Sequence, residues 1–197
     1  LEVLRQPIED GCITVSRVGG SATYPSSFML AAAMNPCPCG YFGHPTRPCT
    51  CSPSAVDRYR QRISGPLLDR IDLHIEVSPV EYDDLASETG GECSADIRAR
   101  VLAARAIQQK RYQGTEIRCN AQIPSARLRG ICRMEPAAAK LLRQAFTGLE
   151  LSARTYDRIL RVSRTIADLA GSETILAVHV SEALQYRALD RKYWYNQ

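Results

Sequence analysis

The densest group of potentially reactive side chains consists of two closely spaced cysteine pairs. Cys37 and Cys39 form the first pair, and nine residues later Cys49 and Cys51 form the second. Four thiolates that converge from two such pairs can bind one tetrahedral metal ion, for which zinc is the natural candidate. His44, in the intervening loop, could replace one of them. Because each spacer is a single residue, shorter than the about two to four usual at zinc sites, free thiols or adventitious disulfides remain the alternative.

Two polar side chains next to apolar segments could act on a phosphate. Asn35 follows the apolar run 28–34, and the carboxyl edge of a parallel sheet is where open α/β folds bind ligands. There Asn35 could orient a water molecule, or it could simply cap a turn. Arg70 lies between two aspartates, a pattern typical of a surface ion pair. The alternative is a guanidinium directed at a phosphate on a neighbouring subunit.

Four arginines on one predicted helix recur at spacings of four, three and three residues: Arg154, Arg158, Arg161 and Arg164. Such a stripe is usually a solvated helix face opposite an apolar one. Arg154 differs because it lies in the first turn, where a helix N-terminus attracts anions. Arg154, together with Arg158, is therefore the candidate for binding a phosphate.

The charges of the chain are strongly segregated, although the net charge is only +4. Residues 72–96 contain eight acids and no Lys or Arg, whereas residues 98–164 contain fifteen Lys or Arg and four acids. This asymmetry predicts an acidic connector and a basic module that can meet the phosphates of a nucleic acid. The alternative is an exposed helical surface that happens to be rich in arginine.

The sequence also excludes some classes of protein. Its longest apolar run is far shorter than the roughly 20 residues that span a bilayer, and no secretion signal opens it. We therefore expect a cytoplasmic protein with no membrane partner, in which the eight cysteines are reduced or bind metal. The chain starts at Leu1 rather than Met, and residues 1–8 are typical of a helix tail, which indicates a piece of a longer protein.

The elements expected to position these residues change character along the chain. Residues 1–80 predict an α/β remnant: a helix tail closed by Asp10-Gly11, a β-hairpin over 12–25, a buried strand over 28–34, an irregular cysteine-rich insertion over 37–51, a helix over 54–68 bent near Gly65-Pro66, and a strand over 71–77. Residues 81–93 predict the acidic connector. Residues 94–197 predict an all-α domain: helices over 95–112 and 135–145, one capped by Ser152 and ended by Gly171, and one over 180–189.

Four segments closely resemble the magnesium-chelatase-like AAA+ proteins of the ComM/YifB type: LRQPIEDG from Leu4, AAMNPCPCG ending at Gly40, ISGPLLDRID from Ile63 and SARTYDRIL from Ser152. The resemblance implies an AAA+ ATPase whose Walker motifs lie before Leu1, together with a Lon-protease-like N-terminal domain and a C-terminal helical lid. The sequence itself contains no G-x-x-x-x-G-K-[ST] phosphate loop. We therefore expect these 197 residues alone to be inactive and monomeric.

The resemblance also implies roles for single residues. Asn35 looks like the sensor 1 residue that aligns the lytic water, Arg70 like an arginine finger, and Arg154 like sensor 2. Residues 12–25 resemble the pre-sensor 1 hairpin, which makes Arg17 a candidate DNA contact.

For the complete protein, the resemblance implies ATP with Mg²⁺ as cofactor and a hexameric ring that moves branched DNA in recombination or natural transformation. The alternatives are a chelatase subunit that drives magnesium into a porphyrin, and a metal-bearing basic adaptor module.

Overall fold

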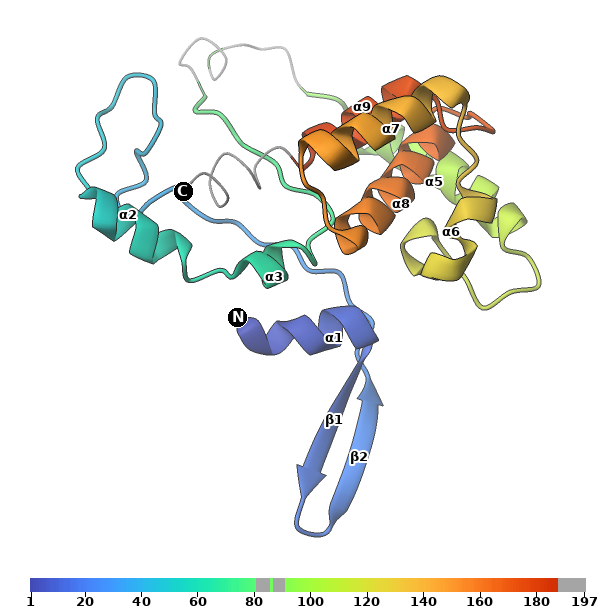
Figure 1. Ribbon diagram of the computed structural model, residues 1–197, viewed down its shortest axis with the longest axis horizontal. Coiled ribbons are helices and arrows are strands. Elements are labelled where there is room, and N and C mark those ends of the chain that lie inside the picture. Colours follow the sequence, from blue (N-terminus) through green and yellow to red (C-terminus); the bar gives the residue numbers. More distant parts are fainter. Residues whose placement is uncertain (81–85, 87–90, 188–197) are drawn as a thin grey trace. The chain divides into compact units, whose positions relative to one another are not determined.

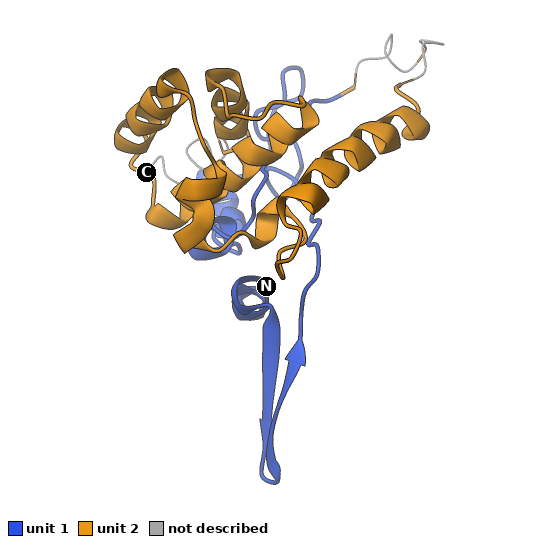
Figure 2. Ribbon diagram, turned by 90° about the vertical axis from the view of Figure 1, so that its right-hand side faces the viewer, with its two compact units in different colours: residues 1–79, 189–197 blue, residues 80–188 orange. Residues whose placement is uncertain are grey.

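The computed structural model describes residues 1–80, 86 and 91–187. The chain divides into two compact units, whose described residues fall within Leu1–Pro79 and Val80–Ala188 (Figure 2). Most of the predicted connector 81–93 and the end of the last predicted helix lie outside the described residues. Among the described residues, no helix combines the length and the apolar character that crossing a membrane requires.

The first unit opens with a short helical segment that leads into a β-hairpin. The 3₁₀ helix η1 (Glu2–Leu4) precedes α1 (Arg5–Asp10). Gly11 ends α1 in the left-handed conformation, with φ of 63°, which glycine adopts without steric cost. Strand β1 (Cys12–Arg17) then pairs antiparallel with β2 (Gly20–Pro25), as the alternation of the sequence predicts. In both ribbon views the hairpin extends away from α1 (Figures 1 and 2).

The helix predicted over 54–68 is divided into two. Helix α2 (Pro53–Arg60) begins at Ser52, whose side chain accepts a hydrogen bond from the Ala55 N–H. Helix α3 (Gly65–Leu68) begins at Ser64, which caps it in the same way. The cap at Ser64 and the missing N–H of Pro66 start a new helix instead of continuing the first.

The prediction of strands over 28–34 and 71–77 is wrong. Among the described residues, β1 and β2 of the hairpin are the only strands. Neither segment forms a helix, and neither pairs as a strand. Their side chains include Met29, 92% exposed, and Val77, 84% exposed. A strand needs neighbours that accept and donate its backbone hydrogen bonds, and none of the described segments pairs with these two.

The second unit is helical. Its elements are α5 (Ser94–Arg111), η2 (Asn120–Gln122), α6 (Ser125–Ile131), α7 (Pro136–Gly148), α8 (Ala153–Leu169) and α9 (Ala177–Gln185). Helix α6 lies between the helices predicted over 95–112 and 135–145, where no helix is predicted, and α9 begins three residues before the predicted start. Ser152 caps α8 as predicted, and α5 begins at Ser94, one residue before the predicted start, with Cys93 at the N-cap position.

Helix α8 is the centre of this unit. It contacts α5, η2, α6 and α9, and its apolar residues Ile159, Leu160 and Ala167 are almost completely buried. Leu142 of α7 and Val180 of α9 belong to the same core. The packing therefore holds α8 along most of its length (Figure 1).

Candidate functional sites

The four cysteines predicted to bind metal converge in the first unit. Sγ of Cys37 lies 3.3 Å from that of Cys39 and 3.7 Å from that of Cys49, and the sulfurs of Cys39 and Cys49 are 3.5 Å apart. With Cys51 included, all four sulfurs lie within 4.8 Å of one another. All four are free cysteines. The structure thus assembles the predicted donor set from a segment without helix or strand.

Backbone N–H groups surround the sulfurs. Those of Tyr41 and Thr50 hydrogen-bond to Cys39 and lower the pKa of its thiol to about 5. At Cys49 the N–H of Cys51 acts to lower the pKa, but withdrawal from water and the neighbouring thiols outweigh it and raise the pKa to about 12. The sulfurs lie so close together that the ionisation of each thiol depends on the charge of its neighbours.

The loop between the cysteine pairs has its own polar contacts, which engage His44. Its Nδ1 accepts hydrogen bonds from the N–H groups of Thr46 and Arg47, at 3.2 and 3.1 Å. The Arg47 guanidinium donates to the Tyr41 hydroxyl at 3.0 Å. The imidazole is thus part of the loop scaffold, and the group of possible metal ligands does not include it.

Asn35 is exposed and ends no strand, which corrects the predicted placement at a sheet edge. Its side-chain amide lies beside the cysteine loop: a Cβ atom on Gly40 would be 4.0 Å from Asn35 Nδ2.

Arg70 forms the ion pair that its acidic surroundings suggest, but with a distant partner. One guanidinium nitrogen contacts Glu9 of α1 and the other donates to the Pro66 carbonyl at 2.7 Å. The contact links the end of α3 to α1 across 61 positions of sequence. Glu9 thereby fixes the direction in which the guanidinium lies.

The arginine stripe of α8 divides into an outer and an inner half. Arg154 is exposed in the first turn, and Arg158 is half-buried one turn later. For the inner half, Arg161 and Arg164, the prediction of a solvated face is wrong. Arg161 donates two hydrogen bonds to the Ile123 carbonyl, at 2.9 and 3.0 Å, and the side chain of Arg164 is 1% exposed.

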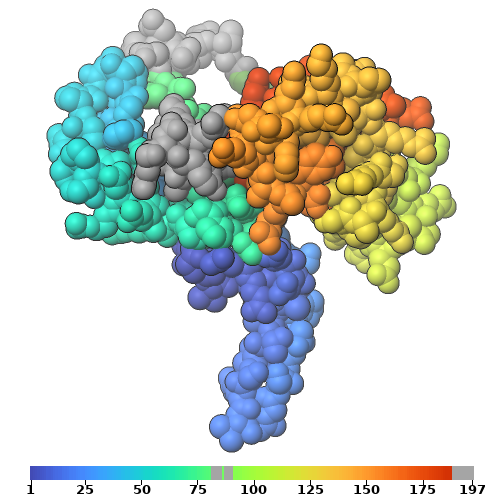
Figure 3. All heavy atoms as spheres, in the orientation of Figure 1, coloured from blue at the N-terminus to red at the C-terminus, as the bar shows by residue number. Residues whose placement is uncertain are grey.

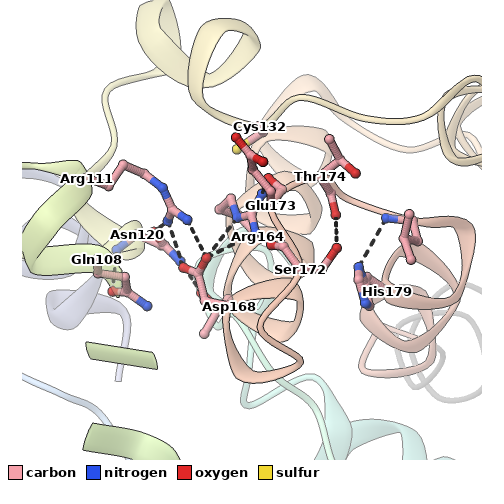
Figure 4. Close-up of polar contacts among 12 residues, drawn as sticks. Gln108, Arg111, Asn120, Cys132, Arg164, Asp168, Ser172, Glu173, Thr174 and His179 are labelled. Carbon is pink, nitrogen blue, oxygen red and sulfur yellow. Dashed lines mark hydrogen bonds and ion pairs between the residues drawn. The ribbon is translucent and has the colours of Figure 1, made fainter. Parts of the chain in front are cut away.

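Arg164 belongs to a buried network that the sequence analysis missed (Figure 4). Asp168, whose side chain is 0% exposed, accepts hydrogen bonds from Arg164, Arg111 and Asn120 at 3.1, 2.8 and 2.8 Å. Arg111 adds a second bond of 2.5 Å to the same carboxylate. Burial acts to raise the pKa of Asp168, but the bonds from Arg111 and Asn120 and the charge of Arg164 prevail and lower it. The Arg164–Asp168 spacing of four is a sequence signal for this pair.

Arg17 lies at the far end of the hairpin, paired with Gly20 beside the exposed turn residue Val18. One face of the ribbon carries two hydroxyl pairs. The Oγ1 atoms of Thr14 and Thr23 are 3.0 Å apart, and the Oγ atoms of Ser16 and Ser21 are 3.2 Å apart. In the space-filling view of Figure 3 the hairpin forms a narrow blue arm.

The candidate residues belong to different units. Arg17, Asn35, Arg70 and the cysteines lie in the first unit, whereas Arg154 and Arg158 lie in the second.

Comparison with known proteins identifies relatives along almost the whole chain. Residues 1–85 match the family model described as magnesium chelatase, subunit ChlI, and residues 91–187 match its C-terminal counterpart. Competence protein ComM of Haemophilus influenzae is 44% identical over 194 residues, which is 97% of this chain and 36% of that protein. Uncharacterized protein YifB of Escherichia coli is 43% identical over 97% of this chain and 37% of its own length.

An uncharacterized protein of Mycobacterium tuberculosis is 39% identical over 95% of this chain. The chain spans little more than a third of the length of these relatives. It belongs to the magnesium chelatase ChlI family and, within that family, is similar to ComM and YifB.

Proposed function

We propose that this chain is part of an ATP-driven AAA+ motor of the cytoplasm that assembles into a hexameric ring and acts on branched DNA in recombination. The observation that carries the proposal is the 44% identity to competence protein ComM, which extends over 97% of the chain. Because the sequence holds no phosphate loop, ATP and Mg²⁺ bind mainly to other residues of the complete protein. The chain supplies side chains that sense the nucleotide.

In this role α8 couples the nucleotide to the second unit, which acts as the lid. Ser152 caps the first turn, where Arg154 reaches the γ-phosphate with Arg158 behind it. The hydrogen bonds of Arg161 to Ile123 and the Asp168 network hold the rest of α8 in the helical core. Because the helix is held at these two points, a displacement of its first turn moves the lid as one body.

Arg70 and Asn35 serve hydrolysis in this proposal. Asn35 aligns the attacking water. Arg70 acts as the finger on the nucleotide of a neighbouring subunit, and Glu9 holds its guanidinium until the more highly charged phosphate competes for it. In the complete protein, Arg70→Ala should abolish hydrolysis while nucleotide affinity is retained. Equal loss of both would contradict the assignment.

The hairpin contacts DNA in this proposal. Residues 12–25 include no acidic side chain, and they present one guanidinium at the far end and hydroxyl pairs along one face. Hydroxyl, backbone N–H and guanidinium groups are the usual donors to DNA phosphates. Six residues per strand give the ribbon a reach of about 20 Å, enough to place Arg17 well beyond α1.

The salt dependence of DNA binding tests this contact. Arg17→Ala in the complete protein should weaken binding to a four-way junction and make the slope of log affinity against log salt shallower by about one phosphate contact. Arg58→Ala, which removes the same charge from an exposed position on α2, is the matched control. An unchanged slope in Arg17→Ala, or an equal change in both variants, would contradict the hairpin contact.

The description of the family model favours a second candidate, a chelatase subunit that uses ATP to drive magnesium insertion into a porphyrin. The two functions differ in what stimulates ATP hydrolysis. A motor of the proposed kind responds to branched DNA, whereas a chelatase subunit responds to its porphyrin-binding partner. Measuring ATP turnover of the complete protein with each addition distinguishes them.

A further inference from the structure

The proposed motor function leaves the cysteine cluster without a role, yet its dimensions indicate a ligand. Four sulfurs around a tetrahedral zinc ion, each about 2.3 Å from the metal, are about 3.8 Å from one another. The three measured separations among Cys37, Cys39 and Cys49 are 3.3, 3.5 and 3.7 Å. These three separations are close to the spacing that one zinc ion sets, and the sulfur of Cys51 lies within 4.8 Å of the other three.

Disulfide bonds do not account for this geometry. A disulfide holds two sulfurs at about 2.05 Å and so selects one partner for each cysteine. In the cluster, Cys37, Cys39 and Cys49 form a triangle of similar sides, and none of the pairs is bonded. Nearly equal separations are expected for ligands that share one central ion.

The backbone around the sulfurs is arranged as in a metal-thiolate site. The N–H groups of Tyr41 and Thr50 point to the Cys39 sulfur, and the N–H of Cys51 points to that of Cys49. Gly40 takes a left-handed conformation, φ 83°, and its N–H closes a turn onto the Cys37 carbonyl at 3.0 Å. Such outer donors orient thiolate ligands and balance their charge.

We propose that Cys37, Cys39, Cys49 and Cys51 bind one structural zinc ion. Four thiolates exclude Mg²⁺ and Ca²⁺, which prefer oxygen ligands. Four protein ligands also fill the coordination sphere of zinc, so no position is left for a reacting water and the ion is structural.

The ion ties two segments of the first unit together. Cys37 follows Asn35 by two residues, and Cys51 directly precedes Ser52, the cap of α2. The zinc ion therefore fixes the segment that carries Asn35 to the start of a helix. Apart from the cysteines, the loop is linked to α2 through the Arg60 guanidinium, which lies 4.4 Å from the centre of the exposed Phe42 ring.

Metal content of the 197-residue chain is the first test. Protein purified without chelator is analysed for zinc and iron by mass spectrometry, and a cobalt titration follows the thiolate-to-metal charge-transfer absorption. We expect one zinc per chain and a cobalt spectrum typical of tetrahedral sulfur ligation. A small fraction of a metal ion per chain together with no cobalt charge-transfer band would overturn the proposal, as would iron in place of zinc.

Variants locate the ion. Cys39→Ser and Cys49→Ser should lose the metal, whereas Cys12→Ser and Cys93→Ser, which change cysteines outside the cluster, should retain it. The helical circular dichroism, which comes mainly from the second unit, reports whether that unit of each variant is folded. Retention of zinc in Cys39→Ser and Cys49→Ser would contradict the assigned ligands.

Protection of the loop from chymotrypsin is a readout that does not depend on variants. Tyr41 and Phe42 lie between the cysteine pairs, so removal of zinc by a chelator should accelerate cleavage there and added zinc should reverse it. Cleavage that is insensitive to both treatments would contradict a structural role. None of these measurements uses nucleotide or DNA, so their result is independent of the proposed motor function.

Discussion

Replacement of Asp168 by alanine tests the physical account of how α8 is held. The carboxylate is 0% exposed and is shared by Arg164, Arg111 and Asn120. Asp168→Ala removes the acceptor but leaves the donors, among them the guanidinium of Arg164, which is 1% exposed. A buried charge that loses its partner is strongly destabilising, because the cost of removing it from water is no longer offset.

The size of the effect follows from which donors remain satisfied. Loss of one partner of a buried ion pair costs about 3–5 kcal/mol of the free energy of unfolding. Arg111 is 22% exposed and can reach water, and Arg164 keeps bonds to the carbonyls of Glu173 and Ser172, at 2.8 and 2.5 Å. We therefore expect the lower end, about 3 kcal/mol, which lowers the melting temperature of a unit of this size by roughly 12–24 °C.

Urea and thermal unfolding of the 197-residue chain, followed by circular dichroism at 222 nm, measure the loss. Glu116→Ala, which removes an exposed carboxylate of the same unit, is the matched control and should change stability by less than about 0.5 kcal/mol. Adding Arg164→Met to Asp168→Ala should recover part of the loss, because it removes the unpaired charge. If Asp168→Ala matched the control, or the two changes were additive, the network would not hold α8.

Three further predictions concern the same unit. Because the pKa of Asp168 is lower in the folded state, its contribution to stability should be complete above the ordinary aspartate pKa of about 4 and decline as the pH falls below it. The slope of the unfolding free energy against pH in this range should therefore be shallower in Asp168→Asn than in the unmodified chain. Ser152→Ala should cost about 1 kcal/mol in urea unfolding, because it removes the side-chain acceptor of the Thr155 N–H. Arg161→Met should cost about 1–3 kcal/mol by the same measurement, because the Ile123 carbonyl loses both of its guanidinium donors; no loss in either variant would contradict the corresponding contact.

The elements predicted correctly from sequence are those specified by local signals. Alternating residues and a Gly-Gly turn predict the hairpin, and the Ser152 cap with a 3.6-residue apolar period predicts α8. The strands over 28–34 and 71–77 were predicted wrongly, because an apolar run gives no information on whether a neighbouring strand is present to pair with it.

The candidate sites follow the same division between local and distant contacts. The convergence of the four cysteines was predicted, because close spacing confines all of them to one short loop. The ion pair of Arg70 with Glu9 and the burial of Arg164 depend on partners far along the chain: Arg111 lies 57 positions from the Asp168 that it shares with Arg164. Helical spacing placed Arg164 on a solvated face, but tertiary contacts decide its environment.

The role of Arg154 is the central claim of the proposed function, and ATP hydrolysis by the complete protein tests it most directly. The turnover stimulated by branched DNA is compared between Arg154→Ala and Arg143→Ala, which removes the same charge from an exposed position on α7. The account predicts that Arg154→Ala loses the stimulated turnover while still binding ATP, and that Arg143→Ala behaves like the unmodified protein. Stimulated turnover in Arg154→Ala equal to that of Arg143→Ala would contradict it.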